Sequence, residues 1–137
     1  MEKEQKELLI IDLCARLPYG VKVHIKGEYK TPRKVYNVYI EDKTITYFKG
    51  FDCIEEDIEN VKPYLRPMSS MTNKEREEYR KFSYYGAAGI RTNDNSEMVG
   101  VPSFEKMDYL ISHHFDFRGL IPKGLAIEAP KDMYNIK

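Results

Sequence analysis

The chain has 137 residues, of which 42% are hydrophobic and 32% are charged, and its 22 basic and 22 acidic side chains cancel. This length and apolar content suit one folded domain and exclude a disordered chain. The balanced charge excludes a long-range field that would draw the whole molecule onto nucleic acid or an anionic membrane, so any such contact has to be local.

An N-terminal helix is predicted over residues 2–17, because apolar side chains recur there at i, i+3, i+4 and i+7. Asp12 and Arg16 fall on the opposite face as an i, i+4 ion pair. Pro18 and Gly20 then end the helix. The apolar stripe consists of Ile10, Leu13, Cys14 and Leu17.

Strands are predicted next. Residues 21–25 alternate apolar and polar side chains, which is the period of a strand with one buried face. Two strands follow at 34–41 and 44–48, joined by a turn at 41–43. A fourth, near 61–65, is bounded by prolines and is therefore expected at a sheet edge. Together they predict an antiparallel meander of three to five strands that could close into a small barrel.

Two helices are predicted in the C-terminal half. Thr72 and Glu75 form a capping box, which starts a helix over residues 73–85. A small, polar connection covers 86–102, and Ser103 caps the last helix. The apolar side of that helix is expected to hold Phe104, Met107, Ile111 and His114.

The predicted fold class is α+β, with an N-terminal helix, the meander, two C-terminal helices and a docked tail. The tail after Gly119 is too apolar to remain free in water, so it has to dock on the domain or on a partner. We expect a single domain over 1–137, with the helix and meander in 1–67 and the helical part and tail in 68–137.

The sequence predicts a cytoplasmic protein with no membrane partner. Its longest apolar stretch, residues 8–11, is far shorter than the roughly 20 residues that span a bilayer, and its first residues do not resemble a secretory signal. Cys14 and Cys53 lack metal-ligand spacing and the density of a disulfide scaffold, so we interpret both as reduced thiols.

His113 and His114, with Asp116 close by, form the one cluster of metal-ligand residue types. Adjacent side chains on a helix point about 100° apart, so both imidazoles cannot face one ion while the helix continues. We therefore predict no metal and no cofactor, with His114 packed inward. A structural or interface role is assigned to the tail residues His114, Arg118, Leu120 and Leu125.

Charge is segregated within the neutral total. Residues 19–39 hold five bases against one acid, whereas residues 41–60 hold seven acids against two bases. Basic side chains interleaved with tyrosines on a small sheet suit single-stranded nucleic acid, which needs phosphate neutralisation and base stacking. Alternatively, these charges pair with the acidic neighbour across the sheet. The candidate nucleic-acid residues are Lys22, Lys26, Lys30, Arg33, Lys34 and Tyr36.

Three stretches carry a family resemblance: LCARLPYGVKV at 13–23, KPYLRPMSSMT at 62–72 and HHFDFRGLIPKGLAIEAPKDMY at 113–134. On these stretches the chain resembles a family of small proteins of gut Bacteroidales and of their phages and mobile elements. The resemblance implies a phage- or prophage-type accessory protein of the bacterial cytoplasm and brings no catalytic residues. The sequence departs from the family pattern at Asp132, where Gly is common. The strand-rich part is also similar in layout to small Src-homology-type barrels of other phage proteins.

Three functions follow from these observations, in this order. The first is a non-enzymatic protein-interaction module, which binds an unknown protein partner or a second copy of itself. The second is a nucleic-acid-binding accessory protein that uses the basic, Tyr-rich sheet. The third is a hydrolase that uses His113 or His114, although no nucleophile is tied to either histidine by its spacing.

Overall fold

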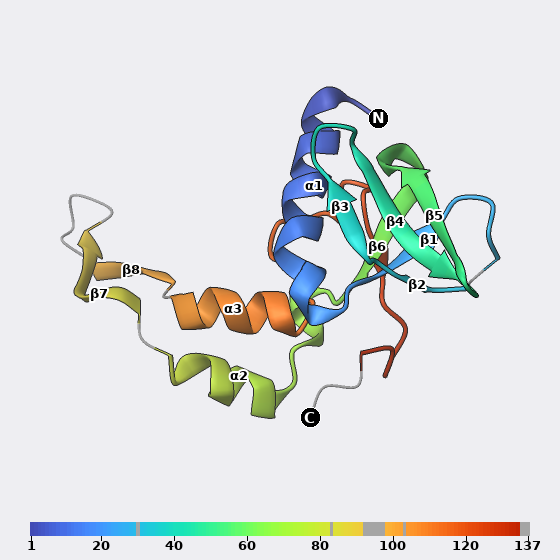
Figure 1. Cartoon of the computed structure of the whole chain (residues 1–137). Coiled ribbons are helices and arrows are strands. Elements are labelled where there is room, and N and C mark those ends of the chain that lie inside the picture. Colours follow the sequence, from blue (N-terminus) through green and yellow to red (C-terminus); the bar gives the residue numbers. More distant parts are fainter. Residues whose placement is uncertain (30, 83, 92–97, 103, 135–137) are drawn as a thin grey trace.

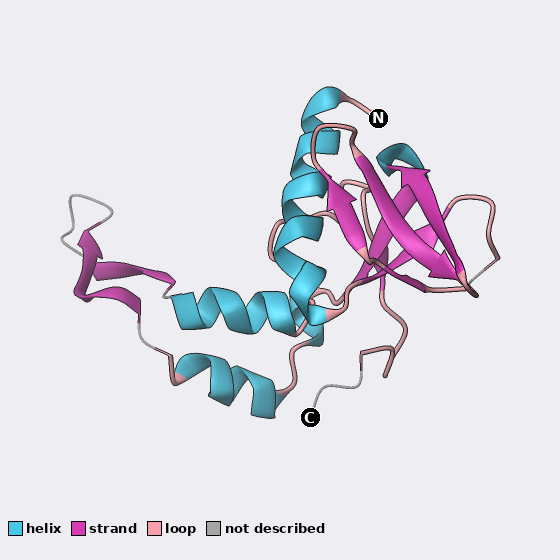
Figure 2. Cartoon of the chain, in the orientation of Figure 1, coloured by secondary structure: helices cyan, strands magenta, loops and turns pink. Residues whose placement is uncertain are grey.

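The computed structural model describes residues 1–29, 31–82, 84–91, 98–102 and 104–134. Within them the chain has the predicted α+β fold, with helices packed beside mostly antiparallel strands (Figures 1 and 2). None of the described helices is long and apolar enough to cross a membrane.

The helices are α1 (Lys3–Arg16), α2 (Asn73–Arg80) and α3 (Phe104–Ser112). The strands are β1 (Lys22–Ile25), β2 (Arg33–Lys34), β3 (Asn37–Tyr39), β4 (Thr44–Lys49), β5 (Asp52–Asp57), β6 (Val61–Leu65), β7 (Tyr84–Arg91), β8 (Met98–Pro102) and β9 (Ile127–Glu128).

The described strands form three sheets, in the orders β2-β1-β6-β9, β3-β4-β5 and β7-β8. The chain changes from the first sheet to the second between two consecutive residues. Val35 N donates to Val21 O beside β1, at 3.1 Å, and Tyr36 N donates to Thr46 O of β4, at 2.8 Å. The sheets do not close into a barrel, so that part of the sequence prediction is wrong.

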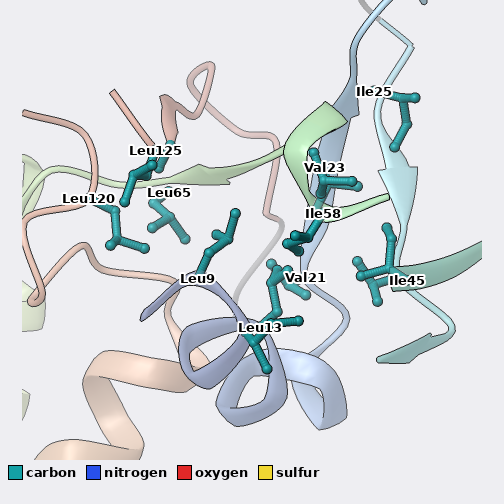
Figure 3. Packing of buried hydrophobic residues seen from close by; sticks show 14 of the residues in the cluster. Leu9, Leu13, Val21, Val23, Ile25, Ile45, Ile58, Leu65, Leu120 and Leu125 are labelled. Atoms are coloured by element: carbon teal, nitrogen blue, oxygen red, sulfur yellow. The ribbon is translucent and has the colours of Figure 1, made fainter. Parts of the chain in front are cut away.

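One hydrophobic core joins α1 to the first two sheets. The inward side chains of β1 and β4 pack against Leu9 and Leu13 of α1. Both leucines are inaccessible to solvent. Figure 3 shows Leu65, Leu120 and Leu125 gathered at one end of this core and Ile45 at the other. Because the tail supplies core side chains, it is docked on the domain as the sequence predicts.

Strand β6 lies inside its sheet, not at the predicted edge, because β9 pairs with it in parallel. The ladder tolerates Pro63 for a geometric reason. Lys26 N donates to Asn60 O at 2.8 Å, and alternation from that pair puts Pro63 at a position that exchanges no hydrogen bond with β1. On the other side β9 pairs only with Tyr64 and Leu65, so the missing N–H is not needed there either.

The C-terminal half differs from its prediction in three places. The capping box forms, but α2 ends at Arg80 and Tyr85 belongs to β7. Much of the expected connection is the β7-β8 hairpin. Helix α3 buries Lys106, Tyr109 and Leu110, whereas Phe104 of the predicted stripe is 77% exposed. The predicted cap at Ser103 lies outside the described residues.

A second hydrophobic cluster joins α2 to α3. It is built around Tyr109, Leu110 and Phe115, against which Tyr79 and Phe82 pack. Figure 1 shows α2 and α3 side by side and running away from the sheets, with the β7-β8 hairpin beyond them. The chain therefore has a larger core under the sheets and a smaller cluster between two helices.

Candidate binding surfaces

The structure brings together only part of the predicted nucleic-acid site. Lys22 of β1 lies directly opposite Lys34 of β2, and both point to the outer face because Val21 and Val23 point inward. Lys26 is exposed at the end of β1. Arg33, which pairs with Val23, lies on the other face. Lys30 lies outside the described residues.

Arg33 is already neutralised within its own hairpin. Its Nε donates to Glu28 Oε2 at 2.8 Å, and its guanidinium lies 5.6 Å from the centre of the Tyr47 ring. This partner lowers the pKa of the Glu28 carboxyl, mainly through the Arg33 hydrogen bond. Arg33 thus pairs with Glu28, the one acid of the basic stretch, and not with the acidic segment 41–60 that the alternative interpretation expected.

Two residues that the sequence analysis did not select join the basic surface. His24 of β1 lies directly opposite Lys62 of β6, on the same outer face as Lys22. The alternation in residues 21–25 and 61–65 places each on a polar face, but only the register of β1 against β6 joins them. We call Lys22, His24, Lys26, Lys34 and Lys62 the basic face.

Tyr36 does not belong to the basic face, because the chain changes sheets at this residue. Its ring meets that of Phe48 edge-on, with centroids 4.8 Å apart, although the two residues remain 55% and 47% exposed. The register places Phe48 and Tyr39 on the same outer face of β3-β4-β5. We call Tyr36, Tyr39 and Phe48 the aromatic face. Two more exposed apolar side chains, Ile40 and Phe51, lie in turns at the two ends of β4.

Strand β5, for which the sequence analysis predicted no strand, borders the aromatic face with the carboxylates of Glu55 and Asp57. It pairs with β4 on one side, and in the described residues no strand covers its other side. None of its acidic side chains forms an ion pair with another described residue. Cys53 is exposed in this strand, and Cys14 is half-buried in α1. The acidic residues are Asp52, Glu55, Glu56 and Asp57.

Three of the four predicted tail residues lie in the interior, whereas Arg118 is partly exposed beside Asp12. Leu120 and Leu125 belong to the main core, and His114 is only 2% exposed. The His114 ring stacks on Tyr134 at 3.8 Å and its Nε2 donates to Tyr19 O at 3.1 Å. Burial, with the nearby positive charge of Arg16, lowers the pKa of His114 to about 4, so the ring is neutral.

Tyr134 holds the tail against the main sheet. Its hydroxyl accepts a hydrogen bond from Lys22 N at 2.9 Å and donates one to Tyr64 O at 2.8 Å, where β1 and β6 separate. Burial raises the pKa of this phenol to about 12. Nearby, Asp132 adopts a φ of 65°, the left-handed region that glycine enters most easily.

His113 Nδ1 is not placed to act as a general base toward the neighbouring serine. His113 lies beyond the end of α3, and its Nδ1 is 2.9 Å from Tyr109 O. A carbonyl can only accept, so this nitrogen carries the proton and cannot take one from Ser112, whose hydroxyl is 3.2 Å away. Among the described residues no group of three metal-ligand side chains comes together.

A cavity of about 500 Å³ separates the turn after β6 from the tail. Arg66 and Glu75 line one wall, and residues 128–134 line the other. The guanidinium donates to both oxygens of Glu75 at 2.7 Å and covers the Phe115 ring at 4.2 Å. This partner holds the pKa of Glu75 at about 2. The Arg66 guanidinium therefore joins α2 to the end of β6 and is already neutralised by Glu75.

Comparisons with protein families, curated proteins and solved structures found no match to this chain.

Proposed function

We propose that this chain is a non-enzymatic interaction module, a phage- or prophage-type accessory protein of the bacterial cytoplasm. The aromatic face is its docking surface for a partner polypeptide. One observation carries the proposal: Tyr36 and Phe48 contact each other yet leave about half of each side chain in water. Aromatic side chains exposed beside each other are typical anchors of protein interfaces, because they bury large areas when a partner covers them.

The carboxylates of β5 define the chemistry of the partner. Glu55 and Asp57 are exposed on the same face of the sheet as Phe48. Asp52, which lies opposite Lys49, is on the other face. An acidic border attracts a basic partner and repels a second acidic strand, which also protects the open edge of β5 from pairing with another copy. The partner segment we expect carries lysine or arginine beside apolar side chains.

The proposal can be tested by comparing what tagged variants retain from the bacterial host. Phe48→Ser with Tyr36→Ser removes the two anchors, while Ile11→Ser removes an exposed apolar side chain from α1 as a matched control. We expect one polypeptide to be retained by wild type and by the control but lost by the double variant. Cross-links from that polypeptide should fall on β3, β4 or β5.

Three results would contradict the proposal. Wild type could retain no polypeptide, all three proteins could retain it equally, or the cross-links could fall on α2 and α3. Circular dichroism of the double variant should match wild type, because both replaced side chains are half-exposed. A retained polypeptide whose cross-linked segment is acidic would contradict the proposed partner chemistry.

A further inference from the structure

The basic face gathers lysines that no carboxylate of the described residues neutralises. Lys22 faces Lys34 across β1 and β2, and His24 faces Lys62 across β1 and β6. Two lysines directly opposite each other, as Lys22 and Lys34 are, repel each other and destabilise the sheet. Within the described residues no carboxylate lies within ion-pair distance of Lys26, Lys34 or Lys62.

The neighbouring Arg33 shows that internal pairing is available in the same hairpin. It lies one residue from Lys34 but on the opposite face, where Glu28 neutralises it. Lys22 has weaker partners than Arg33 has, because its Nζ lies 3.4 Å from a backbone carbonyl, Met133 O, and 6.0 Å from the centre of the Tyr134 ring. Among the described residues, Arg33 on the inner face has a carboxylate partner and the lysines of the outer face have none, which suits an anion supplied from outside.

Planar groups accompany these cations. The His24 ring lies on the basic face and meets Tyr64 edge-on at 6.4 Å. Tyr29, in the turn that follows β1, is 84% exposed. Rows of cations beside accessible rings are what a single strand of nucleic acid requires, because its phosphates need neutralising and its unstacked bases need a surface.

We infer that the basic face binds single-stranded nucleic acid. Lys26, Lys34 and Lys62 contact phosphates, and Tyr29 and His24 stack on bases. An anionic membrane fits less well, because the exposed aliphatic and phenylalanine side chains that could enter a bilayer do not belong to the basic face: Phe48 lies on the aromatic face, Ile11 on α1 and Phe104 on α3. The two faces belong to different sheets, so this site is separate from the proposed docking surface.

The test is fluorescence anisotropy with a labelled 20-nucleotide single strand at low and moderate salt. With three or four phosphates neutralised, the slope of log affinity against log salt should be roughly −2 to −3, at about 0.7 per phosphate. Lys26→Glu with Lys62→Glu should weaken binding by at least about tenfold at low salt. Tyr29→Ala should weaken it by on the order of tenfold, the effect of losing one stacked base.

The matched control is Lys74→Glu with Lys81→Glu, which makes the same charge change on exposed residues at α2. It should bind almost as wild type does, and so should Phe48→Ser, since the aromatic face takes no part. Absence of binding at low salt, or an equal loss in both lysine pairs, would overturn the inference. So would equal affinity for a duplex of the same length, or binding to phosphatidylserine vesicles with none to the single strand.

Discussion

Asp12 is a buried carboxylate at which α1 and the tail meet. It accepts from Arg16 Nε at 2.8 Å and from Arg118 Nε at 3.2 Å, while a terminal nitrogen of Arg16 donates to Phe115 O at 2.6 Å. Asp12 and Arg16 are both inaccessible to solvent. The i, i+4 spacing predicted their pairing, but not that α3 and the tail would cover that face of the helix.

Because both partners are buried, removing only one of them should lower the free energy of unfolding strongly. Asp12→Asn would leave Arg16 charged in the interior without its counter-ion, so we expect the free energy of unfolding to fall by about 3–5 kcal/mol. Glu28→Gln breaks the more exposed pair with Arg33 and should cost less than about 1 kcal/mol. Urea unfolding followed by circular dichroism measures both. Equal, small losses would show that the buried charge is not destabilising when unpaired.

His114 should make stability depend on pH in mild acid. Its pKa is about 4 in the folded chain, below its ordinary value of 6.5, so the unfolded chain takes up the proton first. Stability should therefore be complete above pH 6.5 and be lost as the pH falls toward 4, by up to about 1.4 kcal/mol per pH unit. The pKa of Glu75, about 2, affects stability only at lower pH, below its ordinary value of 4.5.

The measurement is urea unfolding at several pH values between 7 and 5. His114→Asn should flatten the profile, since asparagine tolerates the left-handed φ of 61° at this position but does not titrate. His113→Asn should keep the slope, because it leaves His114 in place. A profile equally steep in wild type and His114→Asn would assign the acid sensitivity to other groups.

At the scale of elements, the sequence predicted those helices and strands whose own residues carry a periodic apolar pattern or a helix cap. Helix α1, strand β1 and the start of α2 carry their own periodicity or cap, and Thr72 and Glu75 do form both hydrogen bonds of the capping box. Strand β5 carries no such signal, because the sequence DCIEED reads as a polar loop. It becomes a strand by pairing along the whole length of β4.

Long-range pairing also explains the errors at β6 and in the candidate sites. The neighbour that places β6 inside its sheet is β9, which lies about sixty residues later in the chain. Lys62 joins the basic face only through the register of β1 against β6, and Tyr36 leaves it because the chain changes sheets. Composition could suggest a basic, tyrosine-rich site, but not that Tyr36 and Tyr39 would lie on a different sheet from its lysines.

At the scale of the whole molecule, the two hydrophobic clusters differ in what they can stabilise. The main core takes side chains from α1, five strands and the tail, whereas α2 has no buried residue of its own. A helix of eight residues is marginal in water without tertiary contacts. Its attachments include the Arg66–Glu75 ion pair, the hydrogen bond from the Tyr109 hydroxyl to Glu78 at 2.9 Å and the packing of Tyr79 in the second cluster.

Helix α2 should therefore open more readily than the rest of the domain. In hydrogen exchange followed by mass spectrometry, we expect amides of residues 73–80 to exchange before those of α1 and β4, because local opening of α2 exposes little core. Arg66→Gln removes the bidentate partner of Glu75 and should speed exchange in 73–80 while leaving β1 and β4 protected. Arg76→Gln changes an exposed arginine on the same helix and should leave the pattern unchanged. If Arg66→Gln speeds exchange equally in α2 and β4, then the two clusters unfold as one unit and the ion pair stabilises the whole molecule.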